Sequence, residues 1–221
     1  MTELAISYRV ADRIAEAIPL EEESLRLKRQ HLRPGDSFTM ESIENLAKCY
    51  EKASRQSEAA ALRLEAAHAR LKKLRGRVQP NDPQLDQPLA KLTQLLIDGQ
   101  NYAEAEVVAR ESLALREKLM PGKWVLFNTR SVLGGILAER KNYAEAEPLL
   151  LSGYEGLKQQ LDTLPAAGKL CLSNSLSRLA HLCEATGQPE KAAEWNKELT
   201  EFDQALAEKH GATPKAPQSQ P

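Results

Sequence analysis

The sequence predicts an all-α fold, a right-handed α-solenoid of about five helical hairpins, and two regularities carry this prediction. An alanine recurs at intervals of about 41–46 residues, at Ala17, Ala59, Ala105, Ala146 and Ala192. A leucine precedes each alanine by thirteen positions, at Leu4, Leu46, Leu92, Leu133 and Leu179. A fixed period of this size indicates stacked supersecondary units, each of which buries its apolar face against a neighbour. No segment alternates apolar and polar residues with a period of two, so we expect no β-sheet.

Each unit is expected to be a pair of helices, and the second unit shows why. Pro34 and Gly35 interrupt the chain, and Ser37 or Thr39 can cap a new helix. Apolar residues then recur three and four positions apart, at Ile43, Leu46, Ala47 and Tyr50. The same pattern along the chain predicts helices over 2–11, 14–32, 38–54, 57–76, 84–99, 103–119, 124–140, 144–160, 167–186 and 190–208.

The turns and the small residues fit this scheme. Gly99 and Gly187 are expected at the tight bends of the third and fifth units, whereas Ser54 and Arg55 predict a looser bend in the second. The recurring alanines are expected where the two helices of a hairpin cross, since a small side chain lets the backbones approach closely.

These boundaries define an array over residues 1–208, with units near 1–32, 37–77, 83–119, 124–161 and 167–208. Residues 209–221 are rich in proline and polar residues and are expected to form a disordered tail. The repeat pattern is already present at Leu4, with no capping segment before it. We therefore expect residues 2–10 to associate with a second copy or with upstream repeats.

Composition excludes several classes of partner. Thirty basic and 31 acidic residues give a net charge of −1, which predicts no nucleic-acid partner and no anionic membrane partner. No apolar run is long enough for a bilayer. The three cysteines are odd in number and widely spaced, which favours a reducing compartment and a cytoplasmic location.

No residue pattern supports an enzyme, a cofactor or a metal site. The four histidines lack metal-ligand spacing, and His181 and Cys183 lie on different helical faces. Gly134 and Gly135 indicate close helix packing rather than a phosphate cradle. The three glutamates at 21–23 are expected on a solvated face.

The repeats resemble tetratricopeptide repeats (TPRs) of the kinesin light chain type. The segments Asn101–Glu106 and Asn142–Leu150 are very close to that family's consensus, and Leu4–Tyr8 and Leu46–Tyr50 match its first-helix signature. The resemblance covers about residues 2–208. It implies a non-enzymatic scaffold that binds a peptide or a partner helix in a concave groove lined by the first helix of each hairpin.

Transferred by register, the resemblance implies a set of groove residues off the Leu-Ala packing face. They are Lys48, Glu51, Lys52, Gln94, Asp98, Asn128, Ser131, Glu139, Asn174, Ser177, His181 and Glu184. The aligned pairs Asn128 with Asn174 and Ser131 with Ser177 suggest a ladder of side chains that bonds a peptide backbone. With lysines and glutamates mixed, the groove is expected not to be cationic and not to clamp acidic C-termini.

An alternative rests on the stretch Trp124–Leu199, which resembles the closing repeats of arrays behind bacterial serine/threonine kinase domains. The chain would then be the regulatory arm of such a kinase, whose catalytic motifs this sequence lacks. An upstream kinase reading frame would decide between the two hypotheses.

Overall fold

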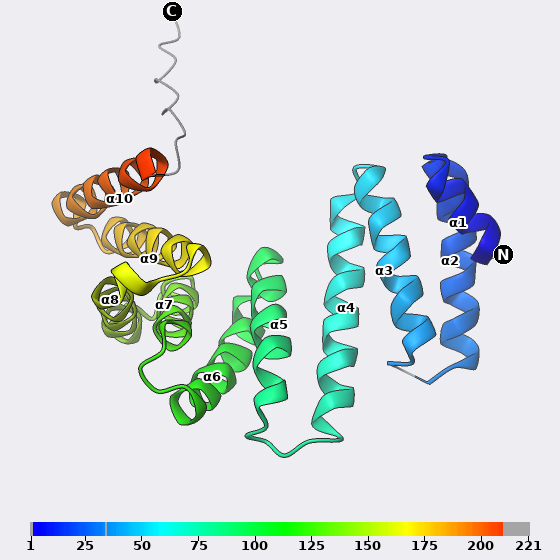
Figure 1. Ribbon diagram of the computed structural model, residues 1–221, viewed down its shortest axis with the longest axis horizontal. Coiled ribbons are helices and arrows are strands. Elements are labelled where there is room, and N and C mark those ends of the chain that lie inside the picture. The colour runs from blue at the N-terminus through cyan, green and yellow to red at the C-terminus, as the bar shows by residue number, and fades with distance from the viewer. Residues whose placement is uncertain (1, 34, 210–221) are drawn as a thin grey trace, which may run out of the picture. The chain divides into compact units, whose positions relative to one another are not determined.

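The structure is a computed structural model that describes residues 2–33 and 35–209. The described residues form ten α-helices and two short 3-10 turns, and the prediction of an all-α repeat fold is confirmed (Figure 1). The helices are α1 (Thr2–Val10), α2 (Ile14–His31), α3 (Ser37–Lys52), α4 (Gln56–Arg75), α5 (Asp86–Asp98), α6 (Tyr102–Leu119), α7 (Trp124–Glu139), α8 (Tyr143–Gln159), α9 (Ala166–Ala185) and α10 (Pro189–Lys209). Each begins and ends within two residues of its predicted boundary. Apart from Lys209, the predicted tail lies outside the described residues.

Contacts between residues group the chain into two compact units, which meet between Val108 and Ala109 inside α6. The first unit contains α1 to α5, and the second contains α7 to α10. In the first unit α1 packs on α2, and α3 packs on both α2 and α4. In the second unit α7 packs on α8, and α9 packs on α7, α8 and α10.

Every hairpin turn places one residue in the left-handed backbone region. These residues are Asp12, Ser54, Gln100, Lys141 and Gly187, with φ between 56° and 72°. Gly99 lies at the bend as expected, but it has φ −85° as the residue that ends α5, and the next residue, Gln100, takes the left-handed conformation. Ser54 gives a turn as tight as the others, because the next residue, Arg55, donates its N–H to Tyr50 O at 2.7 Å. The looser bend expected between α3 and α4 is therefore wrong.

The recurring alanines are buried, as expected of small residues at helix crossings. Ala17, Ala105 and Ala146 are fully buried, and Ala59 and Ala192 nearly so. In the second unit glycines allow a closer approach between α7 and α8. A Cβ atom on Gly134 would lie 2.7 Å from Leu150 Cγ, and one on Gly153 would lie 2.7 Å from the backbone oxygen of Phe127. The assignment of Gly134 to helix packing is confirmed.

The expected solvated face of α2 is only partly exposed. Glu23 is half-buried and pairs with Arg26, and Glu22 is exposed and accepts a hydrogen bond from the Tyr50 hydroxyl at 2.6 Å. Glu21, however, is fully buried, and neither carboxylate oxygen has a hydrogen-bond partner in the described residues. The prediction is wrong for Glu21, because α1 and α3 both pack against α2 and exclude solvent from it.

Candidate functional site

The predicted groove residues of the first unit lie on α3 and α5, and most form hydrogen bonds or ion pairs with other side chains. Lys48 is exposed, with its Nζ 3.9 Å from Glu44 Oε1. Glu51 accepts two hydrogen bonds from the Arg63 guanidinium of α4, which lower the pKa of the Glu51 carboxyl. Lys52 pairs with Asp12 of the preceding hairpin at 2.6 Å. On α5, Gln94 donates to Asp98 at 2.7 Å.

In the second unit, the structure separates the predicted residues into two groups. Glu139, Asn174, Ser177, His181 and Glu184 are exposed. His181 Nε2 of α9 lies 3.2 Å from Glu139 Oε1 of α7, so this pair joins the two first helices.

Two other predicted positions on α7 differ from these. Asn128 is half-buried. Ser131 is fully buried: its backbone nitrogen and Cβ pack against Gly153 of α8, and its Oγ accepts a hydrogen bond from Arg178 of α9 at 3.1 Å. The assignment of Ser131 to a solvent-facing groove is therefore wrong.

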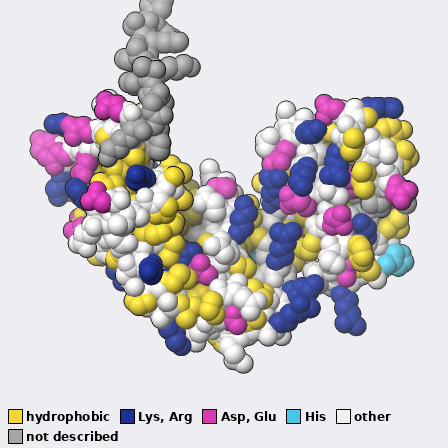
Figure 2. Space-filling model, in the orientation of Figure 1, with side chains coloured by type: hydrophobic (Ala, Val, Ile, Leu, Met, Phe, Trp, Pro, Cys, Tyr) yellow, Lys and Arg dark blue, Asp and Glu magenta, His cyan; other side chains and the backbone are white. Residues whose placement is uncertain are grey.

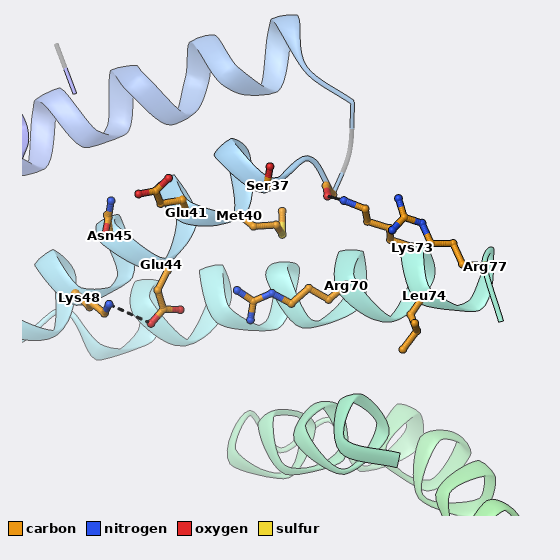
Figure 3. A pocket seen from close by; sticks show the side chains of 11 residues that line it. Ser37, Met40, Glu41, Glu44, Asn45, Lys48, Arg70, Lys73, Leu74 and Arg77 are labelled. Atoms are coloured by element: carbon orange, nitrogen blue, oxygen red, sulfur yellow. Dashed lines mark hydrogen bonds and ion pairs between the residues drawn. The ribbon is translucent and has the colours of Figure 1, made fainter. Parts of the chain in front are cut away.

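The hollow surface of the first unit lies along α4. One cleft of about 690 Å³ lies between the start of α3 and the end of α4 (Figure 3). A second, of about 540 Å³, lies between α4 and α5. Glu44 and Arg70 line both clefts. We refer to the two clefts together as the α3–α5 groove.

The α3–α5 groove is cationic; the mixed charge was expected of a different surface, the groove lined by the first helices. Its basic lining residues are Lys48, Arg63, Arg70, Lys73, Arg77 and Lys91. Its acidic ones are Glu41 and Glu44. Figure 2 shows Lys and Arg side chains gathered over α4, with fewer acidic side chains among them. Because fixed charges of one sign in a cleft focus the potential there, the groove attracts anionic groups.

The second helix of the hairpin supplies most of this charge. Arg63, Arg70, Lys73 and Arg77 belong to α4 or directly follow it, and are three, four or seven positions apart, which places them on one helical face. The prediction considered only the first helix of each hairpin and so missed them. The sequence signal for them is the basic run at 70–77, in which Arg70, Lys73 and Arg77 recur at helical spacing.

Not all of these cations are held by partners. The Lys73 side chain donates to the Gly35 carbonyl at 2.9 Å, and that of Arg63 is held by Glu51. Within residues 2–33 and 35–209, the side chains of Arg70, Arg77 and Lys91 form no hydrogen bond or ion pair. In Figure 3 the Arg70 side chain extends along α4 towards Glu44.

Between the basic residues the groove is apolar. Met40, Ala66, Ala67, Leu74, Pro88 and Leu95 contribute to its lining. A ligand that combines acidic and apolar side chains would match both parts of the surface.

The described residues contain no cluster of three or more histidine, cysteine or acidic side chains able to hold a metal ion. None of the described helices is sufficiently long and apolar to cross a bilayer. Cys49 and Cys183 are buried, and burial raises the pKa of both thiols. His181 is exposed while Cys183 is buried, so the two side chains lie on different faces of α9, as predicted.

Among known proteins, similarity to this chain was found with solved structures. No protein-family model matches the sequence, and no curated protein matches it. The crystal structure of kinesin light chain nearly identical TPR-like repeats from Podosopora anserina is 19% identical over 92% of this chain and 93% of that one, with a TM-score of 0.56. A variant of those repeats with one substitution is also 19% identical, over 95% of this chain and 94% of that one, with a TM-score of 0.57.

A third similar structure is BtubC (BKLC) from P. vanneervenii. It is 18% identical, over 99% of this chain and 83% of that chain, with a TM-score of 0.56. At these identities the likeness establishes the fold. The chain therefore has the TPR-like helical repeat fold of these kinesin light chain-like structures.

Proposed function

We propose that this chain is a non-enzymatic scaffold that binds an acidic segment of a partner protein in the α3–α5 groove. The TPR-like repeat fold supports the general role, since stacked helical hairpins form extended surfaces for protein partners. The observation that carries the specific role is the set of three groove cations, Arg70, Arg77 and Lys91, whose side chains have no partners in the described residues.

The lining of the groove favours a segment in which acidic and apolar residues are mixed. Carboxylates would meet Arg70 and Lys91, and an arginine can hold a carboxylate through two parallel hydrogen bonds. Apolar side chains would cover Ala66, Ala67 and Leu95. Lys48, a residue implied by the family resemblance, belongs to this surface.

A defined probe tests the proposal. A fluorescent peptide that alternates glutamate with leucine is titrated with the full chain, and its counterpart with glutamine in place of glutamate serves as the uncharged control. We expect binding of the acidic peptide that weakens as salt rises, because the contacts are between charges. Equal binding of the two peptides would contradict the proposal.

Variants locate the binding surface. Arg70→Gln combined with Lys91→Gln should weaken binding of the acidic peptide by about tenfold or more, through loss of hydrogen bonds to charged groups. Lys118→Gln combined with Lys123→Gln removes the same charge from exposed positions near the start of α7 and should have little effect.

The ladder of aligned asparagines in the second unit gives the competing surface. Asn128→Ala combined with Asn174→Ala should leave the affinity for the acidic peptide unchanged if the peptide binds the α3–α5 groove. Weakening by this double variant alone, with unchanged melting, would assign binding to α7 and α9 instead.

A further inference from the structure

A second cleft of about 670 Å³ lies beside the α3–α5 groove in the first unit, between α2, the start of α3 and α4. It shares only Gly35 and Met40 with the groove and is otherwise lined by different residues. We refer to it as the α2–α4 cleft. The helical period of α4 explains the separation. Glu65, His68, Lys72 and Arg75 are three or four positions apart and line this cleft, whereas Arg70, Lys73 and Arg77 line the groove.

The α2–α4 cleft is strongly basic. Its basic lining residues are Arg29, Arg33, Lys72 and Arg75, and its acidic lining residue is Glu65. Arg29 pairs with Glu65 at 2.5 Å. The side chains of Arg33 and Lys72 have neither a hydrogen bond nor an ion pair to any described residue. The basic residues that line the cleft therefore outnumber the acidic one.

A buried hydroxyl gives a second, independent observation. Thr39 lines the cleft, is 4% exposed, and its Oγ1 has no hydrogen-bond partner in the part of the chain that the structure describes. Buried hydroxyls are nearly always hydrogen-bonded, so an unpaired one indicates a missing acceptor.

We propose that the α2–α4 cleft binds a phosphate group. A phosphate offers several acceptor oxygens and up to two negative charges, which match the Thr39 hydroxyl and the Arg33 and Lys72 cations. The excess of basic over acidic lining residues suits a dianion better than a single carboxylate. The cleft is larger than a phosphate ion, so it also has room for a phosphorylated side chain. This site is independent of the function proposed for the α3–α5 groove.

Two probes test the site and identify the source of the phosphate. The first is inorganic phosphate, added at constant ionic strength against chloride while thermal unfolding is measured at mildly alkaline pH. A ligand that binds the folded chain raises its melting temperature with concentration. The second is a fluorescent phosphoserine peptide, compared with its unphosphorylated form. Tighter binding of the phosphopeptide than of inorganic phosphate would assign the site to a modified side chain, and equal binding would assign it to the free anion.

Three variants make the test specific. Thr39→Val keeps the shape of the side chain and removes the hydroxyl, and Arg33→Gln combined with Lys72→Gln removes two cations. Each should weaken phosphate binding by about tenfold or more. Lys118→Gln combined with Lys123→Gln is the matched control, because it removes two cations from exposed positions that line neither the cleft nor the groove.

Thr39→Val should melt no lower than the parent, since it also removes an unpaired buried hydroxyl. A phosphate effect no larger than that of chloride would overturn the proposal. So would equal phosphate affinities in the parent, Thr39→Val and the double variant.

Discussion

The Arg178 side chain of α9 donates a hydrogen bond from Nη1 to Ser131 Oγ of α7 at 3.1 Å. This contact joins the first helices of two successive hairpins. Ser131 is fully buried, whereas Ser177, at the equivalent position of α9, is exposed. Burial also lowers the pKa of the Arg178 guanidinium, as expected for a cation that has lost solvent.

The two serines give a matched pair of variants. Ser131→Ala removes the acceptor from a desolvated guanidinium, and we expect it to reduce the free energy of unfolding by about 1–3 kcal/mol. Ser177→Ala, at an exposed position, should stay within about 0.5 kcal/mol of the parent. Urea unfolding followed by circular dichroism measures both. Equal stabilities of the two variants would show that the Arg178 contact contributes little.

Gly153→Ala tests the close approach of α7 and α8. The added Cβ would lie 2.7 Å from both the Phe127 oxygen and the Ser131 nitrogen, and backbone atoms cannot move aside easily. We expect a loss of about 1–3 kcal/mol from overpacking. Gly99→Ala is the control, because its Cβ would lie 3.4 Å from the Leu95 oxygen, an ordinary contact. A Gly153→Ala protein as stable as the parent would mean that the two helices separate at little cost.

Ala146→Leu tests the register of the repeat. Ala146 is fully buried where α8 crosses α7, so a larger side chain should overpack the contact and cost about 1–3 kcal/mol. Glu117→Gln changes an exposed side chain and should stay within about 0.5 kcal/mol. Denaturation midpoints compare the two, and a midpoint for Ala146→Leu equal to that of the parent would contradict the packing at this position.

Ser54→Gly tests the turn between α3 and α4. Ser54 has φ 60°, a region that costs a residue with a Cβ about 1 kcal/mol. Glycine should therefore stabilise the chain there by a few tenths of a kcal/mol up to about 1 kcal/mol. The same substitution at Ala53, where φ is −83°, should not stabilise it. Thermal melting distinguishes the two variants, and an equal fall in both would argue against strain at Ser54.

Glu21 should make stability depend on pH. Desolvation by burial raises the pKa of its carboxyl, which the charges of Arg9 and Lys28 partly oppose and that of Glu41 reinforces. The folded chain therefore holds the proton more tightly than the unfolded chain. The stabilisation is complete below the unfolded pKa of 4.5 and is lost as pH rises through the higher folded value.

Glu21→Gln should consequently be more stable than the parent at neutral pH, and its stability should fall less between mildly acidic and neutral pH. Glu23→Gln, which removes the surface pair with Arg26, should change the unfolding free energy by no more than about 0.5 kcal/mol. Urea unfolding at a series of pH values measures both. Lower stability of Glu21→Gln at neutral pH would show that Arg9 and Lys28 stabilise the charged form.

The sequence by itself determined the repeat, the helix boundaries and the packing residues. These follow from local rules, because apolar spacing, proline and glycine act within a few positions along the chain. The buried alanines at 17, 59, 105, 146 and 192 are the clearest case, since their period indicated both the fold and the crossing points.

Only the tertiary structure decided which polar residues face solvent and which charges share a cleft. Ser131 and Ser177 are equivalent in the repeat, yet Ser131 is buried against α8 and bonded to Arg178, whereas Ser177 is exposed. Glu21 is buried because neighbouring helices close over it. The basic run at 70–77 is one charged segment in the sequence, but the turn of α4 divides it between two clefts, and each cleft also needs residues brought from other helices.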